Sequence, residues 1–105
     1  MKRNIVLAAM LLGAGLQAQA ALTVYGNFKC SAWSQDTTNA RKGWVLGYVS
    51  GINTALGEKD GDLLDNVNKA EEIYDWVDNY CSNHPDDSVQ KASTQFYLDL
   101  RRRYK

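Results

Sequence analysis

The sequence predicts an all-α fold: a small bundle of three main helices, preceded by a short N-terminal helical turn and held by one disulfide. Three observations support this prediction. Small and bulky residues recur with a period of four over 43–56, which fits a helix and no strand. Two later stretches carry apolar residues at steps of three and four. The chain also contains two cysteines that can form a bridge.

Residues 1–20 have the pattern of a signal peptide. Two basic residues open the chain, an unbroken apolar run covers 5–12, and Ala18 and Ala20 have the spacing that signal peptidase recognises. The apolar run is too short for a membrane anchor. We therefore expect cleavage after Ala20, export to the periplasm and one helical domain over 21–105.

Cys30 and Cys81 are expected to pair, because two cysteines in a small domain of an oxidising compartment most often form a disulfide. The bridge would close a loop of about 50 residues, which stabilises a domain by about 4 kcal/mol in the chain-entropy account. A reactive thiol and a metal site are the alternatives. With His84 as the single histidine, a four-ligand zinc site would need carboxylates, so we expect no metal.

The first elements of the mature chain are short. Residues 22–29 alternate weakly and contain a glycine, which indicates an extended arm or a short strand. Residues 30–34 can form one helical turn. The first long helix is predicted over 39–57, with Gly57 as the residue that follows its end.

Gly43, Gly47 and Gly51 form one row on that helix. Each costs about 1 kcal/mol relative to alanine in a helix interior. We expect the close approach of a neighbouring helix to offset this cost, so that Gly47→Leu would overpack the contact. The same spacing marks membrane helix pairs, but this apolar run is shorter than the roughly 20 residues of a span. The helix is therefore predicted to be the centre of a soluble bundle.

Two amphipathic helices follow, over 66–82 and 85–102. The first combines an apolar face with an acidic face, and the second has an inner face that includes Phe96 and Leu100. Pro85 breaks the chain between the helices and suits the first turn of the second one. Arg101, Arg102 and Arg103 lie at the end of the second helix, where positive charge is favourable.

The acidic face and its neighbouring loop form a candidate partner surface. Trp76 lies off the main apolar stripe of this helix and is the candidate aromatic anchor. The members of the surface are Asp60, Asp62, Glu71, Asp75, Trp76 and Asp78. Acidic residues around such an anchor would speed association with a basic partner. The alternative is that Trp76 packs inward and the carboxylates are only solvated. Both interpretations stay open at this point.

No constellation for catalysis is present in the sequence, so we expect no enzyme, no catalytic residue and no cofactor. His84 stands alone in a turn, no serine occupies an elbow motif, and no glycine-rich phosphate loop occurs. The full chain balances 12 Lys and Arg against 12 Asp and Glu, and removal of the two basic residues of the leader leaves a small acidic excess. This balance argues against nucleic acid as a partner.

Several short motifs together resemble a known family. They are Cys30 with Trp33, the run 47–52, Tyr80-Cys81 and His84-Pro85, followed by the amphipathic C-terminal helix. In these the chain resembles the Rap/Tai family of type VI secretion amidase immunity proteins, which stand beside the small HdeA-like periplasmic proteins. The chain lacks the further cysteines that some immunity members carry.

The resemblance implies an exported, non-catalytic, all-helical protein-binding domain with a disulfide. Rap/Tai members neutralise a peptidoglycan amidase effector, and HdeA-like members are acid-activated chaperones. The expected partner is therefore another exported protein, either an effector enzyme or an unfolded client. A homodimer stays open as an alternative. The resemblance marks no effector-contact residues on this chain.

Overall fold

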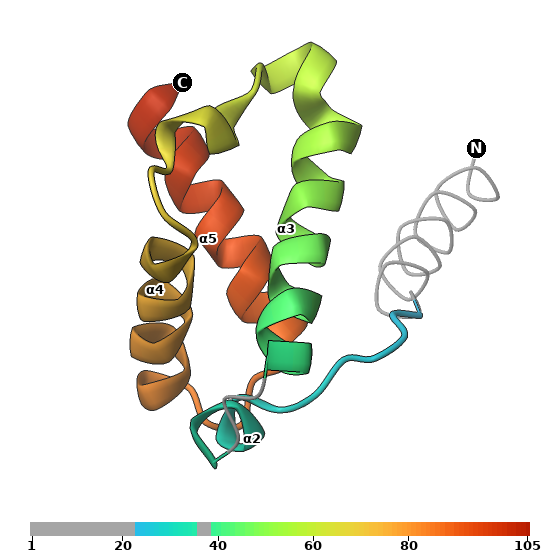
Figure 1. The fold of residues 1–105 in the computed structure, drawn as a ribbon, viewed down its shortest axis with the longest axis vertical. Helices are drawn as coiled ribbons and strands as arrows, with labels where there is room; N and C mark the ends of the chain where they lie inside the picture. The colour runs from blue at the N-terminus through green and yellow to red at the C-terminus, as the bar shows by residue number, and fades with distance from the viewer. Residues whose placement is uncertain (1–22, 36–38) are drawn as a thin grey trace, which may run out of the picture.

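Four α-helices make up the part of the protein that the computed structural model describes, residues 23–35 and 39–105 (Figure 1). They are α2 (Cys30–Gln35), α3 (Asn39–Asp60), α4 (Ala70–Asn83) and α5 (Val89–Tyr104), with the short 3-10 helix η1 (Leu63–Asn66) after α3. The all-α prediction is confirmed. Within these residues an isolated bridge between Lys29 and Ser88 is the only β pairing. The predicted signal peptide 1–20 lies outside the described residues.

The central helix is α5. It packs against α3 on one side and α4 on the other, while α3 and α4 contact each other little (Figure 1). Its buried residues are Val89, Ala92, Ser93, Phe96, Tyr97 and Leu100. The prediction of a central helix near 39–57 is therefore wrong. The longer α3 buries two valines, Val45 and Val49, together with Asp60 at its end.

The glycine row of α3 does not pack against any other helix of the described residues. Gly43, Gly47 and Gly51 are exposed, and a Cβ built on any of them would have no described neighbouring atom within 4 Å. The prediction that Gly47 faces a neighbouring helix is wrong. The reason is that Val45 and Val49 form a second row with the same period of four. Burying such side chains stabilises the fold by about 1.5–3 kcal/mol each, which a smooth glycine surface does not match.

The end of α3 lies three residues beyond the predicted one. Gly57 remains inside the helix, and Gly61 follows its end with φ of +80°. The Gly61 amide donates to the Gly57 carbonyl at 2.8 Å. Glycine adopts this left-handed conformation at little cost, which explains why the helix ends there.

The two later helices also begin after their predicted starts. The η1 turn and an extended linker occupy 63–69, so α4 begins at Ala70. Ser88 caps α5, because its Oγ accepts a hydrogen bond from the Lys91 amide at 3.1 Å. Pro85 therefore lies in the turn before α5 and not in its first turn.

The predicted disulfide is confirmed. Cys30 at the start of α2 is bonded to Cys81 in α4, with an S–S distance of 2.17 Å and a Cα–Cα distance of 4.8 Å. Both cysteines are buried. The Cys30 amide also donates to the Asp87 carbonyl at 2.8 Å, so the start of α2 is fixed to the turn between α4 and α5.

None of the helices in the described part of the chain has the length and apolar character that a membrane crossing requires.

Candidate partner-binding site

Asp60, predicted as part of the partner surface, is buried. Its Oδ1 lies 2.8 Å from Lys105 Nζ and 3.4 Å from Arg101 Nε, and its Oδ2 accepts a hydrogen bond from the Tyr97 hydroxyl at 3.0 Å. The hydrogen bond from Lys105 is the largest cause that lowers the pKa of Asp60, and Tyr97 and Arg101 add to it against the effect of burial. Asp60 therefore joins the ends of α3 and α5 and is not part of an exposed acidic surface.

Asp78 and Asp62 are also engaged within the chain. Asp78 accepts a hydrogen bond from the indole N–H of Trp33, whose side chain is 1% exposed. Asp62 accepts one from the Asn53 amide at 2.8 Å. Both residues are exposed, but their carboxylates also stabilise the fold, because each accepts a hydrogen bond from a side chain in another element.

The remaining members of the predicted surface lie together on α4. Glu71 and Asp75 are exposed one turn apart, and α4 contains no Lys or Arg. Trp76 is half-buried: it stacks on Tyr80 with ring centroids 5.6 Å apart and meets Phe96 edge-on at 5.7 Å. The ring is therefore neither fully buried in the core nor fully exposed, and its role as an anchor for a partner stays a prediction.

A groove of about 440 Å³ opens beside Trp76. The linker 66–68 and Glu72 contribute one wall, and Arg103 and Tyr104 at the end of α5 contribute the other. The apolar lining consists of Val67, Trp76, Phe96 and Leu100. The groove thus combines an apolar floor with a polar rim, the usual composition of a site that binds side chains of a partner.

The two charged residues of the groove differ in their environment. Arg103 pairs with Asp99 at 3.0 Å, and its guanidinium lies 5.3 Å from the centre of the Tyr104 ring. The Glu72 carboxylate makes no hydrogen bond or ion pair with the described residues. Glu72 is therefore the charged group that remains available to a ligand.

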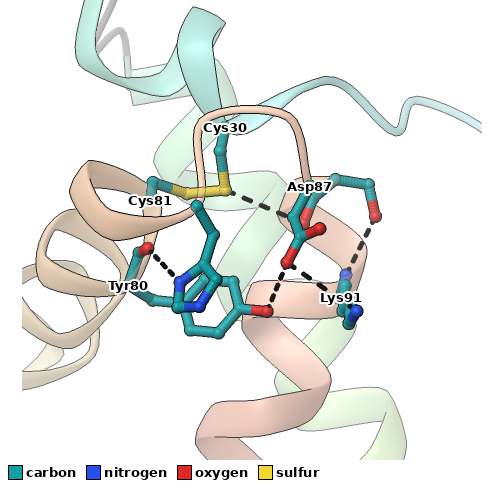
Figure 2. A network of polar contacts seen from close by, with 7 residues as sticks. Cys30, Tyr80, Cys81, Asp87 and Lys91 are labelled. Carbon is teal, nitrogen blue, oxygen red and sulfur yellow. Dashed lines mark hydrogen bonds and ion pairs between the residues drawn. A yellow bond between two sulfur atoms is a disulfide. The ribbon is translucent and has the colours of Figure 1, made fainter.

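The turn between α4 and α5 carries a second polar cluster, shown in Figure 2. The Tyr80 hydroxyl donates to Asp87 at 2.6 Å, and Lys91 lies 3.8 Å from the same carboxylate (Figure 2). Burial, together with the bond to Asp87, raises the pKa of Tyr80 to about 12. The hydrogen bond from Tyr80 lowers the pKa of Asp87. At neutral pH a neutral Tyr80 hydroxyl therefore donates to a charged Asp87 carboxylate.

His84 belongs to this turn as well. Its ring stacks on Tyr80 with centroids 4.2 Å apart, and its Nδ1 lies 2.9 Å from the Tyr80 carbonyl oxygen. Cys81 is three residues away, but its sulfur is part of the disulfide and cannot act as a nucleophile beside His84. The cluster serves to fix the turn.

Sequence reasoning identified Trp76 but missed most of the groove around it. Phe96 and Leu100 were expected only as inward-facing residues of the last helix, and Arg103 only as a cation at its end. The groove arises because η1 displaces the start of α4, so that the linker faces the last turns of α5. The one signal in the sequence was that Trp76 stands off the main apolar stripe.

No group of three or more His, Cys, Asp or Glu side chains within 23–35 and 39–105 is placed to hold a metal ion.

Comparison of the chain with family models, with curated proteins and with solved structures gives no match. Its function is therefore inferred from its own residues.

Proposed function

We propose that the chain is an exported protein-binding domain that neutralises a peptidoglycan amidase effector of type VI secretion. The observation that carries the proposal is the groove between α4 and α5, where Trp76 lies beside carboxylates that are open to solvent. A half-buried aromatic residue in a concave surface is the kind of anchor that dominates binding energy at protein interfaces. The motif resemblance described above supplies the partner class.

The chain would act by occupying a surface of the amidase, with no chemistry of its own. The disulfide and the Tyr80–Asp87 hydrogen bond favour a fixed surface at neutral pH, which limits the entropy lost on binding. Glu72 and Asp75 would speed association with a basic patch on the partner and make it sensitive to salt. Trp76 would mainly determine how slowly the complex dissociates.

The test is capture of exported proteins from the native host by the immobilised, oxidised chain 21–105 at low and high salt. An amidase should be retained, with weaker retention at high salt because the acidic rim is screened. Captured protein should regain peptidoglycan hydrolysis after it is eluted from the immobilised chain. Absence of any amidase at either salt concentration would count against the proposal.

The buried Asp60 supports a second candidate, an acid-activated chaperone. Protonation of Asp60 would leave Arg101 and Lys105 without their shared counter-ion at the junction of α3 and α5. At the same pH the other carboxylates would also become neutral, and the resulting positive charge favours expansion and exposure of apolar faces.

Aggregation assays separate the two candidates. A chaperone should suppress aggregation of a model client at about pH 2 and leave it unchanged at pH 7, whereas an immunity protein should leave aggregation unchanged at both pH values. Acid expansion alone decides nothing, because small proteins in general expand under these conditions. Client protection at low pH, without amidase capture at neutral pH, would favour the chaperone.

A further inference from the structure

We infer that the groove beside Trp76 binds a peptide segment of the partner in which an apolar side chain stands next to Lys or Arg. This inference rests on the proposed protein-binding function and names the chemistry of what enters the groove. It follows from the shape of the floor, the backbone of one wall and the charge of the rim.

The floor fits an apolar side chain. Phe96 and Leu100 are 2% and 1% exposed, so they close the bottom of the groove. Trp76 and Tyr104 also line the groove, and Tyr104 is 48% exposed. A volume of about 440 Å³ lies within the range of about 300–1,000 Å³ that ligand pockets have. It accommodates side chains of a peptide segment, not a folded element.

One wall has the backbone conformation that suits an extended peptide. Val67 has φ −94° and ψ 118°, and Lys69 has φ −140° and ψ 143°. Between them, Asn68 lines the groove and its side-chain amide makes no hydrogen bond with the described residues. An extended segment lying along this linker could exchange hydrogen bonds with that amide.

The rim selects a cation. Arg103 forms an ion pair with one carboxylate oxygen of Asp99, and Arg102 forms an ion pair with the other. Arg102 does not line this groove; it lines a different hollow with Arg101 and Lys105. Glu72 has no such ion-pair partner among the residues that the structure describes, and α4 itself contains no Lys or Arg. A Lys or Arg could lay its methylene groups on Trp76 and direct its charged end to Glu72.

The chain provides its own probes for a test, because its three indole N–H groups have distinct environments. Trp33 donates to Asp78, Trp44 donates to the Tyr25 carbonyl at 2.9 Å, and Trp76 lines the groove. The oxidised chain 21–105 would be titrated by NMR with acetyl-Leu-Arg-Leu amide and with the same peptide carrying Gln or Glu in place of Arg.

The Arg peptide should shift the indole resonance of Trp76 and leave those of Trp33 and Trp44 in place. It should bind about twofold to fivefold more tightly than the Gln peptide, the range expected of a solvent-exposed ion pair, and the Glu peptide should bind most weakly. Glu72→Gln should abolish the preference for Arg over Gln. Glu71→Gln is the matched control, since it removes the same charge from the same turn outside the groove lining, and it should keep the preference.

Equal binding of the three peptides, an unmoved Trp76 resonance, or an equal effect of Glu71→Gln and Glu72→Gln would overturn the inference. The outcome is distinguishable from failure of the proposed function. If the amidase is captured equally by wild type and Glu72→Gln, the function stands and this inference fails. If the Arg peptide binds as described and no amidase is captured, the groove chemistry stands and the proposed partner is wrong.

Discussion

Asp60 is surrounded by cations and a hydroxyl at the end of the α3–α5 contact. Its ordinary pKa of 3.8 is lowered in the fold, chiefly by the hydrogen bond from Lys105. A carboxylate whose pKa is lower in the folded than in the unfolded state stabilises the fold above the unfolded value. That contribution is lost as the pH falls through the folded pKa. Asp60 should therefore contribute to stability at neutral pH and contribute progressively less below about pH 4.

Asp60→Asn should lower the free energy of unfolding at pH 7, because Arg101 and Lys105 lose their counter-ion while remaining at the same junction. The difference from wild type should shrink between pH 4 and pH 2, where the wild-type carboxylate also becomes neutral. Urea unfolding across this pH range measures it, with Asp62→Asn as the control at an exposed carboxylate. A difference that is constant with pH would contradict the role of the charge.

Asp78→Ala should cost about 1–3 kcal/mol, because it leaves the indole N–H of the buried Trp33 without an acceptor. Asp75→Ala removes the same group one turn earlier from an exposed position of α4, and should change stability by less than about 0.5 kcal/mol. Chemical denaturation of both variants measures the contrast. Equal effects of the two substitutions would show that Asp78 is only a solvated carboxylate.

At the scale of elements, α3 exposes Gly43, Gly47 and Gly51. Gly47→Ala should stabilise the protein by about 0.4–1 kcal/mol, because alanine restricts the unfolded chain and meets no described atom in the fold. Gly47→Leu should likewise be tolerated, contrary to the overpacking expected from the sequence. Thermal melting of both variants is the measurement.

Gly26→Ala is the contrasting control. Gly26 has φ of +77°, and a Cβ there would lie 2.7 Å from Trp44 Nε1. The substitution should destabilise the protein for both reasons. If Gly47→Ala destabilises as much as Gly26→Ala, the outer face of α3 packs against something and is not open.

The existence and type of the long helices could be predicted from sequence, while their ends and packing could not. Periodicity places apolar residues on one face but does not say which of two rows with the same period is buried on α3. Gly57 and Gly61 are both plausible residues to follow the end of α3. The helix continues to Asp60, where the contact with Tyr97 favours the later end. Likewise, Pro85 and Ser88 are both plausible N-terminal residues of α5. The helix begins after Ser88, because the Ser88 hydroxyl caps it.

The candidate site shows a similar limit. Trp76 could be selected from the sequence because it stands beside acids and off the apolar stripe. Its groove could not, since the walls come from the linker 66–68 and the last turn of α5, far apart in the chain. Asp60 was wrongly placed on the surface, and the hydrogen bond of the exposed Asp78 was missed, because a sequence does not reveal that Lys105 or Trp33 lies opposite them.

At the scale of the whole molecule, the disulfide joins α2 to the last turn of α4, just before the turn that leads to α5. The Cys30→Ala/Cys81→Ala double variant should lose about 2–5 kcal/mol of stability, because the bridge constrains the unfolded chain over a separation of 51 residues. Guanidinium unfolding measures the loss. Thiol titration of denatured, unreduced protein should find no free thiol, and two free thiols would contradict the bridge.

The central claim, that the groove beside Trp76 holds a protein partner, is tested most directly by the dissociation constant of the captured amidase for wild type and Trp76→Ala. Both proteins would be measured well below the lower melting temperature, since Trp76 also packs on Phe96. We predict that Trp76→Ala weakens binding by at least about tenfold, the effect of losing an aromatic anchor, while Asp62→Asn binds like wild type. Wild-type affinity in a folded Trp76→Ala protein would contradict the claim.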